Sequence, residues 1–233
     1  AAVNQFVVTF SIAVNPQITK SYAQGDNLRM YYLVCKGAKF SYFLLLLFAI
    51  PLIFEADKVL ELWLVNVPEG APLFMKLALI GAMVLGNSGY TACIATGFIK
   101  KYSIIITLIG SLNFIITWIA YKMGASVEMT YFIYIGVYLV VQVARLLLMK
   151  EIIYFPIMMY VKEVIGRIIV PSLIALVFPN VLCRLIEPSL GRTFFVCVSS
   201  VIWTGFCISL FGLTKGERKI IFGKLKSIIN KFL

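Results

Sequence analysis

The sequence predicts an all-α integral membrane protein folded as a polytopic helical bundle. The chain has 233 residues, of which 61% are hydrophobic and 13% are charged, and its mean hydropathy is +0.97. Soluble domains carry about 25% charged residues. The apolar residues lie in runs long enough to cross a bilayer as helices. These runs do not alternate apolar and polar residues, so a β-barrel is disfavoured and a helical bundle follows.

Six full spans are predicted, preceded by a shorter apolar segment. Residues 1–14 are too few to cross a bilayer, and Pro16 is expected to help end this segment in the polar stretch 15–26. A short helix along the membrane surface is expected at residues 21–37. The spans are predicted at residues 37–54, 73–98, 102–121, 128–149, 168–186 and 193–213.

Three amphipathic stretches lie outside these spans. Residues 58–70, KVLELWLVNVPEG, fit a short interfacial helix with Trp63 at headgroup depth. Residues 150–167 mix charges, aromatic residues and Pro156, which favours an elbow lying in the interface. The tail, 214–233, combines six basic residues with apolar residues at helical spacing, which favours a surface helix on anionic lipid. Tight turns are expected at residues 100–101, 122–127 and 187–192.

The basic residues predict the orientation of the chain. The regions 15–39, 100–101, 145–167 and the tail together hold 16 of the 21 Lys and Arg residues, and the connections on the other side hold five. The positive-inside rule places the richer side, including the C-terminus, in the cytoplasm. The net charge of +11 is therefore assigned to membrane orientation and anionic lipid, and no nucleic-acid partner is expected.

The composition also argues against an enzyme or a metal protein. The ten acidic residues all lie in loops or at the ends of segments, and no catalytic motif is present. The chain contains no histidine, and its five cysteines show no metal-binding spacing. No catalytic activity, cofactor, metal or disulfide is therefore expected, and the cysteines are expected to act as small hydrophobic residues.

Polar and cationic residues in or near the spans are the candidates for binding a substrate. Amides and hydroxyls inside spans either bond one helix to another or line a wet cavity that binds a sugar. Basic residues at the ends of spans either set the topology or bind a phosphate. The candidate substrate-binding residues are Lys20, Lys39, Asn87, Ser88, Asn113, Gln142 and Arg145.

Three stretches together resemble a known family. These are NPQITKSYAQGD at 15–26, VLELWLVNVPEGA at 59–71 and IATGFIKKY at 94–102. In order and spacing they resemble the bacterial polysaccharide-export flippases of the superfamily that also contains the MATE multidrug exporters. The likeness covers about the first 150 residues, and the last third resembles these proteins in topology more than in motif.

The resemblance implies a two-lobed transporter with a central cavity that alternates between inward-open and outward-open states. Such proteins flip a polyprenyl-pyrophosphate-linked oligosaccharide from the cytoplasmic to the periplasmic leaflet of the bacterial inner membrane, for surface polysaccharide such as lipopolysaccharide. The chain is expected to be the C-terminal lobe, and its partner would be the N-terminal lobe of the same protein. Residues 1–149 would supply second-lobe helices, a partial helix and four spans. Residues 150–213 would add a cytoplasmic elbow and two spans, and 214–233 a cytoplasmic basic tail.

Two other functions remain open. An ion-coupled multidrug exporter on the same fold would be indicated by acidic residues inside the membrane. A membrane polysaccharide polymerase would be indicated by a large outer loop with Arg or His, but the outer connections here are short and histidine is absent.

Overall fold

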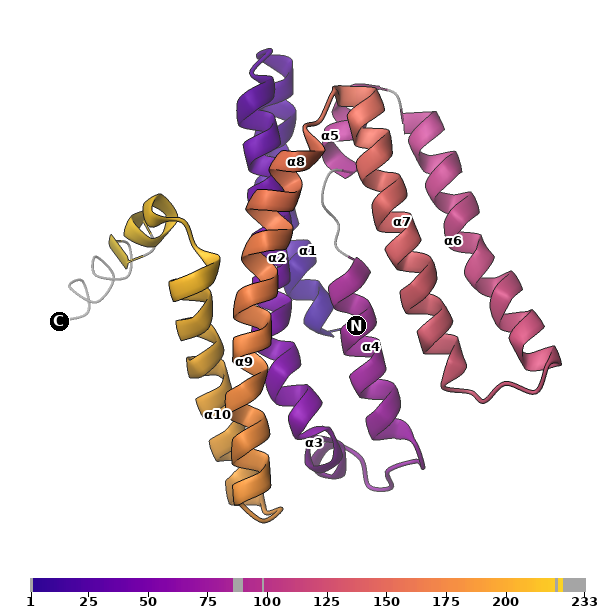
Figure 1. Cartoon of the computed structure of the whole chain (residues 1–233), viewed down its shortest axis with the longest axis vertical. Coiled ribbons are helices and arrows are strands. Elements are labelled where there is room, and N and C mark those ends of the chain that lie inside the picture. Colours follow the sequence, from indigo (N-terminus) through magenta and orange to yellow (C-terminus); the bar gives the residue numbers. More distant parts are fainter. Residues whose placement is uncertain (1, 86–89, 98, 221, 224–233) are drawn as a thin grey trace.

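The protein is a bundle of long, mostly antiparallel helices (Figure 1). The computed structural model describes residues 2–85, 90–97, 99–220 and 222–223. All regular structure in these ranges is helical, and five helical segments are long and apolar enough to cross a membrane. The prediction of an all-α, multi-pass membrane protein is therefore confirmed.

The first two helices form a hairpin. Helix α1 (Ala2–Ala23) is followed after a short turn by α2 (Asn27–Phe54). Asp26 begins α2, because its carboxylate accepts a hydrogen bond from the Arg29 backbone N–H at 3.0 Å. The predicted end of the first segment near Pro16 is wrong, since α1 continues through this proline to Ala23.

The predicted surface helix at residues 21–37 is also wrong. Most of this stretch is the first part of α2, and it is packed inside the bundle: Met30, Val34 and Cys35 are at most 3% exposed. Their spacing places them on one face of the helix. Two basic residues, Arg29 just before and Lys36 just after these buried residues, made the stretch look like a surface helix.

The next three helices are short. The interfacial helix predicted in residues 58–70 is present as α3 (Ala56–Trp63), and Trp63 is 81% exposed. The span predicted at 73–98 is described as two helices, α4 (Ala71–Leu85) and α5 (Tyr90–Ala95). Residues 86–89 and 98 of this span lie outside the described residues. The predicted limit at residue 98 is too late, because α5 ends at Ala95 and residues 96–97 form a turn.

Helices α6 (Ile99–Lys122) and α7 (Met129–Ile153) form a second hairpin. The turn predicted at 100–101 is wrong, because Lys100 and Lys101 belong to the first turn of α6. The chain instead turns at Gly97, whose φ of 79° suits glycine. The turn predicted at 122–127 is confirmed within a residue or so.

The last membrane segments are nearly continuous helices with local changes of pitch. α8 (Ile157–Tyr160), the π-helical turn η1 (Val161–Ile165) and α9 (Gly166–Leu185) form one apolar segment, and α10 (Leu190–Cys207) and η2 (Ile208–Gly212) form another. The elbow predicted at 150–167 is wrong in extent. It is confined to residues 154–156, because α7 runs to Ile153 and α8 begins at Ile157.

Helix α2 is the centre of the bundle. One hydrophobic cluster joins its first half to α1, α5, α6, α7 and η1, and includes Ile18, Met30 and Met149. A second cluster joins its second half to α9, α10 and η2, and includes Phe43 and Ala175. In Figure 1 the turns at 24–26, 96–97 and 154–156 lie at one end of the bundle, and α3 and the turns at 123–128 and 186–189 at the other.

A close contact of Gly212 with α2 gives a stability prediction. A Cβ atom at residue 212 would lie 2.4 Å from Cζ of Phe43, which is 3% exposed. Gly212→Ala is therefore expected to destabilise the protein by about 1–3 kcal/mol through overpacking, measured by denaturant unfolding in detergent. Gly205→Ala is the control, because nothing lies within 4 Å of its Cβ position. Equal stability of the two variants would contradict this packing.

Candidate functional site

Gln142 and Arg145 are the candidate binding residues that the structure brings together. Both lie on α7, inside a segment apolar enough to cross the membrane. Gln142 is 13 residues into the helix, about 20 Å along it at 1.5 Å per residue. Arg145 follows almost one turn later, and its Nη1 donates a hydrogen bond to Oε1 of Gln142 at 3.3 Å.

Gln142 also bonds α4. Nε2 of Gln142 donates a hydrogen bond to the carbonyl oxygen of Val84 at 2.9 Å. Val84 lies in the last described turn of α4. Gln142 therefore bonds α7 to the main chain of α4.

Aromatic residues lie beside this pair. Arg145 is close enough to Tyr102 on α6 to interact with it electrostatically. The Tyr102 ring is 3% exposed and lies 5.7 Å from the ring of Tyr90 at the start of α5. The group thus combines a guanidinium, an amide and two phenols from three helices. These groups bind phosphate oxygens and sugar hydroxyls by hydrogen bonds and sugar rings by stacking.

Lys39 is held in a buried ion pair. Its side chain is 2% exposed, and its ammonium lies 2.7 and 2.9 Å from the two carboxylate oxygens of Glu217. Glu217 also accepts a hydrogen bond from the Thr214 N–H, and its own N–H donates to the Thr214 hydroxyl, which makes a capping box for residues 215–220. Burial raises the pKa of Glu217, but the bonds from Lys39 and Thr214 outweigh it and lower the pKa below 4.5.

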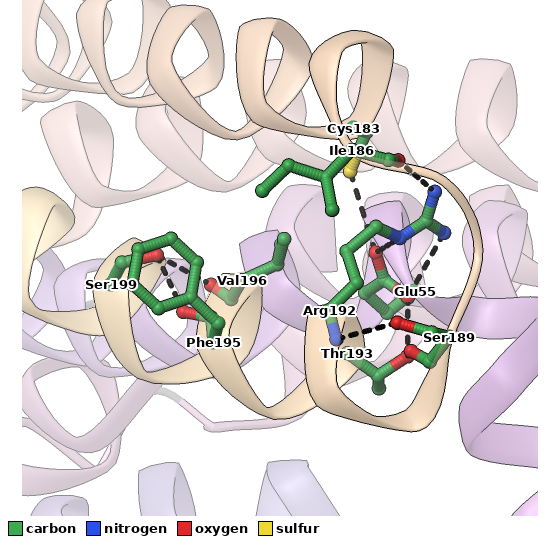
Figure 2. Close-up of polar contacts among 9 residues, drawn as sticks. All are labelled: Glu55, Cys183, Ile186, Ser189, Arg192, Thr193, Phe195, Val196 and Ser199. Carbon is green, nitrogen blue, oxygen red and sulfur yellow. Dashed lines mark hydrogen bonds and ion pairs between the residues drawn. The ribbon is translucent and has the colours of Figure 1, made fainter.

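A second buried ion pair lies at the C-terminal end of α2. Glu55, which follows the last residue of α2, is 1% exposed. Figure 2 shows Arg192 reaching it from α10, with Nε 3.1 Å from Oε1 and Nη2 3.3 Å from Oε2. The Thr193 hydroxyl donates to Oε2 at 2.7 Å, and the Cys183 thiol donates to Oε1 at 3.5 Å. The carboxylate is therefore bonded to both α9 and α10.

The start of α10 positions these partners. The Ser189 hydroxyl accepts a hydrogen bond from the Arg192 N–H at 3.1 Å and so caps the helix. This cap places Arg192 and Thr193 in the first turn, where both side chains face Glu55 (Figure 2). The Ile186 carbonyl accepts a further hydrogen bond from Nη1 of Arg192 at 3.1 Å. Sequence reasoning missed this site, because an acid at the end of an apolar segment reads as a solvated residue.

The other candidate residues are spread over the molecule. Lys20 is exposed near the end of α1. Asn113 is half-buried on α6, and its Oδ1 has no hydrogen-bond partner in the part of the chain that the structure describes. Asn87 and Ser88 lie outside the described residues.

The described residues offer few groups for metal or thiol chemistry. The described residues contain no group of three or more His, Cys, Asp or Glu side chains that could hold a metal ion. Cys35, Cys93, Cys183, Cys197 and Cys207 are free thiols. The polar arrangement can bind anions or hydrogen-bonding groups and can stabilise the helix packing.

Comparison of the chain with protein-family models, with curated proteins and with solved structures gives no match.

Proposed function

We propose that this chain is the C-terminal lobe of a transporter that flips a polyprenyl-pyrophosphate-linked oligosaccharide from the cytoplasmic to the periplasmic leaflet of the bacterial inner membrane. In this proposal the oligosaccharide is a repeat unit for surface polysaccharide. The N-terminal lobe of the same protein supplies the rest of the cavity. No bond is made or broken during flipping, so the chain needs a polar path and no catalytic group.

Arg145 is the observation that carries the proposal. An ionisable residue inside a membrane helix is costly and usually has a function. Arg145 lies beside Gln142 and close to Tyr102, and Gln142 bonds the Val84 carbonyl of α4. Arginine also matches a pyrophosphate, since its fork of N–H donors bonds phosphate oxygens in pairs.

The packing of the family-like stretches supports the same proposal. The first and third stretches are distant in sequence, but Ile18 from one and Tyr102 from the other belong to a single buried cluster. The stretches are thus parts of one structural unit, as expected if they came from one ancestral fold. The turns at 24–26, 96–97 and 154–156 lie at one end of the bundle (Figure 1), and the helix ends beside these turns carry Lys20, Lys100, Lys101 and Lys150, which supports a cytoplasmic position for this end.

Arg145→Gln tests the proposal. Removing a charged hydrogen-bonding partner costs about 1.5–3 kcal/mol, so we expect flipping to fall at least about tenfold at normal expression. The measurement is surface polysaccharide in a strain that depends on the variant, together with lipid-linked repeat units accumulating in the inner leaflet. Arg145→Lys is expected to retain part of the activity.

Arg167→Gln is the matched control for this experiment. It removes the same charge from α9, where Arg167 pairs with Glu163 in a partly exposed i,i+4 contact, and it should leave flipping unchanged. Normal flipping by Arg145→Gln at normal expression would refute the role of Arg145. Lys39→Gln tests in the same assay whether Lys39 binds the substrate, although the Lys39 ammonium is already neutralised by Glu217.

The buried acid Glu55 favours a second candidate, an ion-coupled multidrug exporter. A carboxylate inside the bundle is the group that such exporters use to bind a proton or cation. Here it is paired with Arg192 and bonded by Thr193, which supports a structural role instead. If Glu55→Gln abolishes drug resistance without lowering the amount of folded protein, the exporter is favoured over the flippase.

A further inference from the structure

A surface groove lies where α7 gives way to α8. It encloses about 680 Å³ and is lined mainly by the apolar residues Leu147, Phe155, Ile157 and Met158. Leu147 and Met158 are 56% and 64% exposed, so the chain itself does not fill the groove. The groove is distinct from the Gln142–Arg145 site and from both buried ion pairs.

The backbone at the elbow holds the groove open. Tyr154 has φ 54° and ψ 35°, a left-handed conformation that non-glycine residues adopt at a cost. This conformation ends α7 abruptly and leaves Tyr154 86% exposed. The next residue, Phe155, turns inward and packs edge-on against Tyr31 with ring centroids 5.3 Å apart. The Tyr31 hydroxyl also donates to the Ile153 carbonyl, which ties the end of α7 to α2.

The rim of the groove carries a net positive charge. Lys150 and Glu151 both line it. Glu151 is paired with Lys101 of α6, whereas the exposed Lys150 has no acidic partner among the described residues. Its ammonium is therefore the charge that the rim presents to a ligand. Since Lys150 lies in the last turn of a membrane-spanning helix, this charge stands at the depth of lipid headgroups.

We infer that this groove binds an anionic phospholipid, with the phosphate on Lys150 and an acyl chain along Leu147, Ile157 and Met158. Moving an acyl chain from the bilayer into the groove exchanges one apolar environment for another. The preference for this lipid therefore comes from the charge. One lysine near a membrane surface contributes about 1 kcal/mol toward anionic lipid, which is about fivefold in occupancy.

Native mass spectrometry of the 233-residue chain tests the inference. The purified protein is titrated with phosphatidylglycerol and phosphatidylcholine of identical acyl chains, and the retained lipid is counted. We expect about fivefold higher occupancy by phosphatidylglycerol at the first site. Lys150→Gln should remove this preference and Lys150→Arg should keep it. Met158→Trp should lower the retention of both lipids, because the larger side chain occupies the groove.

Lys162→Gln is the matched control, since Lys162 is an exposed lysine on η1 that does not line the groove. It should leave the preference unchanged. Equal retention of the two lipids by the unaltered protein, or a preference that survives Lys150→Gln, would overturn the inference. A dimer that Met158→Trp dissociates would also overturn it, because the groove would then be an interface between two copies.

Discussion

Replacing Arg192 with methionine is expected to lower the free energy of unfolding by about 3–5 kcal/mol. The substitution leaves the Glu55 carboxylate, which is 1% exposed, without its cation. Removing one partner of a buried ion pair has a cost of this size, because the other charge stays buried and uncompensated. Denaturant unfolding in detergent, followed by circular dichroism, measures the loss.

Two further variants separate the ion pair from general damage to the helix end. Glu55→Gln combined with Arg192→Met should recover most of the loss, since replacing both charges of a buried pair is often nearly neutral. Arg184→Met removes an exposed arginine at the same end of the bundle, and its effect should stay within about 0.5 kcal/mol. If Arg192→Met is no more destabilising than Arg184→Met, the pairing with Glu55 contributes no stability.

The two buried ion pairs enclose the same part of the bundle. On α2, Lys39 and Glu55 are separated by an apolar stretch without a charge. On α10 and η2, the stretch from Thr193 to Thr214 also carries none. The second hydrophobic cluster fills the space between these helices and includes Phe43, Ala175 and Ile208. The two pairs thus join α2 to the C-terminal segments, one near the middle of α2 and one at its end, at the two limits of an uncharged layer.

Some of the chain reversals and one short helix could be predicted from local signals. The reversals at 123–128 and 186–189 follow from polar residues and turn formers between long apolar runs, and the structure has them close to the predicted positions. The amphipathic helix ending at Trp63 was predictable from its apolar spacing. These features depend on residues that are near each other in sequence, so the pattern alone is informative.

Features that depend on distant residues could not be predicted. Arg29 and Lys36 made the first part of α2 look solvated, although its other face packs against α1 and η1. The partners of Lys39 and Glu55 lie 178 and 137 residues away, and no local rule joins them. The sequence did single out Gln142 and Arg145 as polar residues in an apolar helix, and the hydrogen bond from Gln142 to Val84 of α4 appears only in the fold.

Lys39→Met is expected to cost about 3–5 kcal/mol of unfolding free energy at neutral pH, because it leaves Glu217 buried beside α2 without its cation. The effect should depend on pH. Folding lowers the pKa of Glu217 below 4.5, so the folded protein binds this proton less tightly than the unfolded chain does. The stabilisation by this ion pair is therefore complete above about pH 4.5 and is lost as the pH falls through the pKa that Glu217 has in the folded protein.

The difference in unfolding free energy between the unaltered protein and Lys39→Met should shrink on acidification. Once Glu217 is protonated it no longer carries the buried negative charge, so the variant no longer suffers from the loss of Lys39. Unfolding curves at neutral pH and near pH 4 give the comparison. Lys36→Met is the matched control. Its lysine lies less than one turn away on α2, with the ammonium over the exposed ring of Tyr32, and such a contact contributes about 0.5–1 kcal/mol. Two outcomes would contradict this prediction: a loss for Lys39→Met equal to that of the control, or a loss that stays constant as the pH falls. Either would mean that the ion pair does not hold the C-terminal segment to α2, and that the packing of Gly212 on Phe43 does.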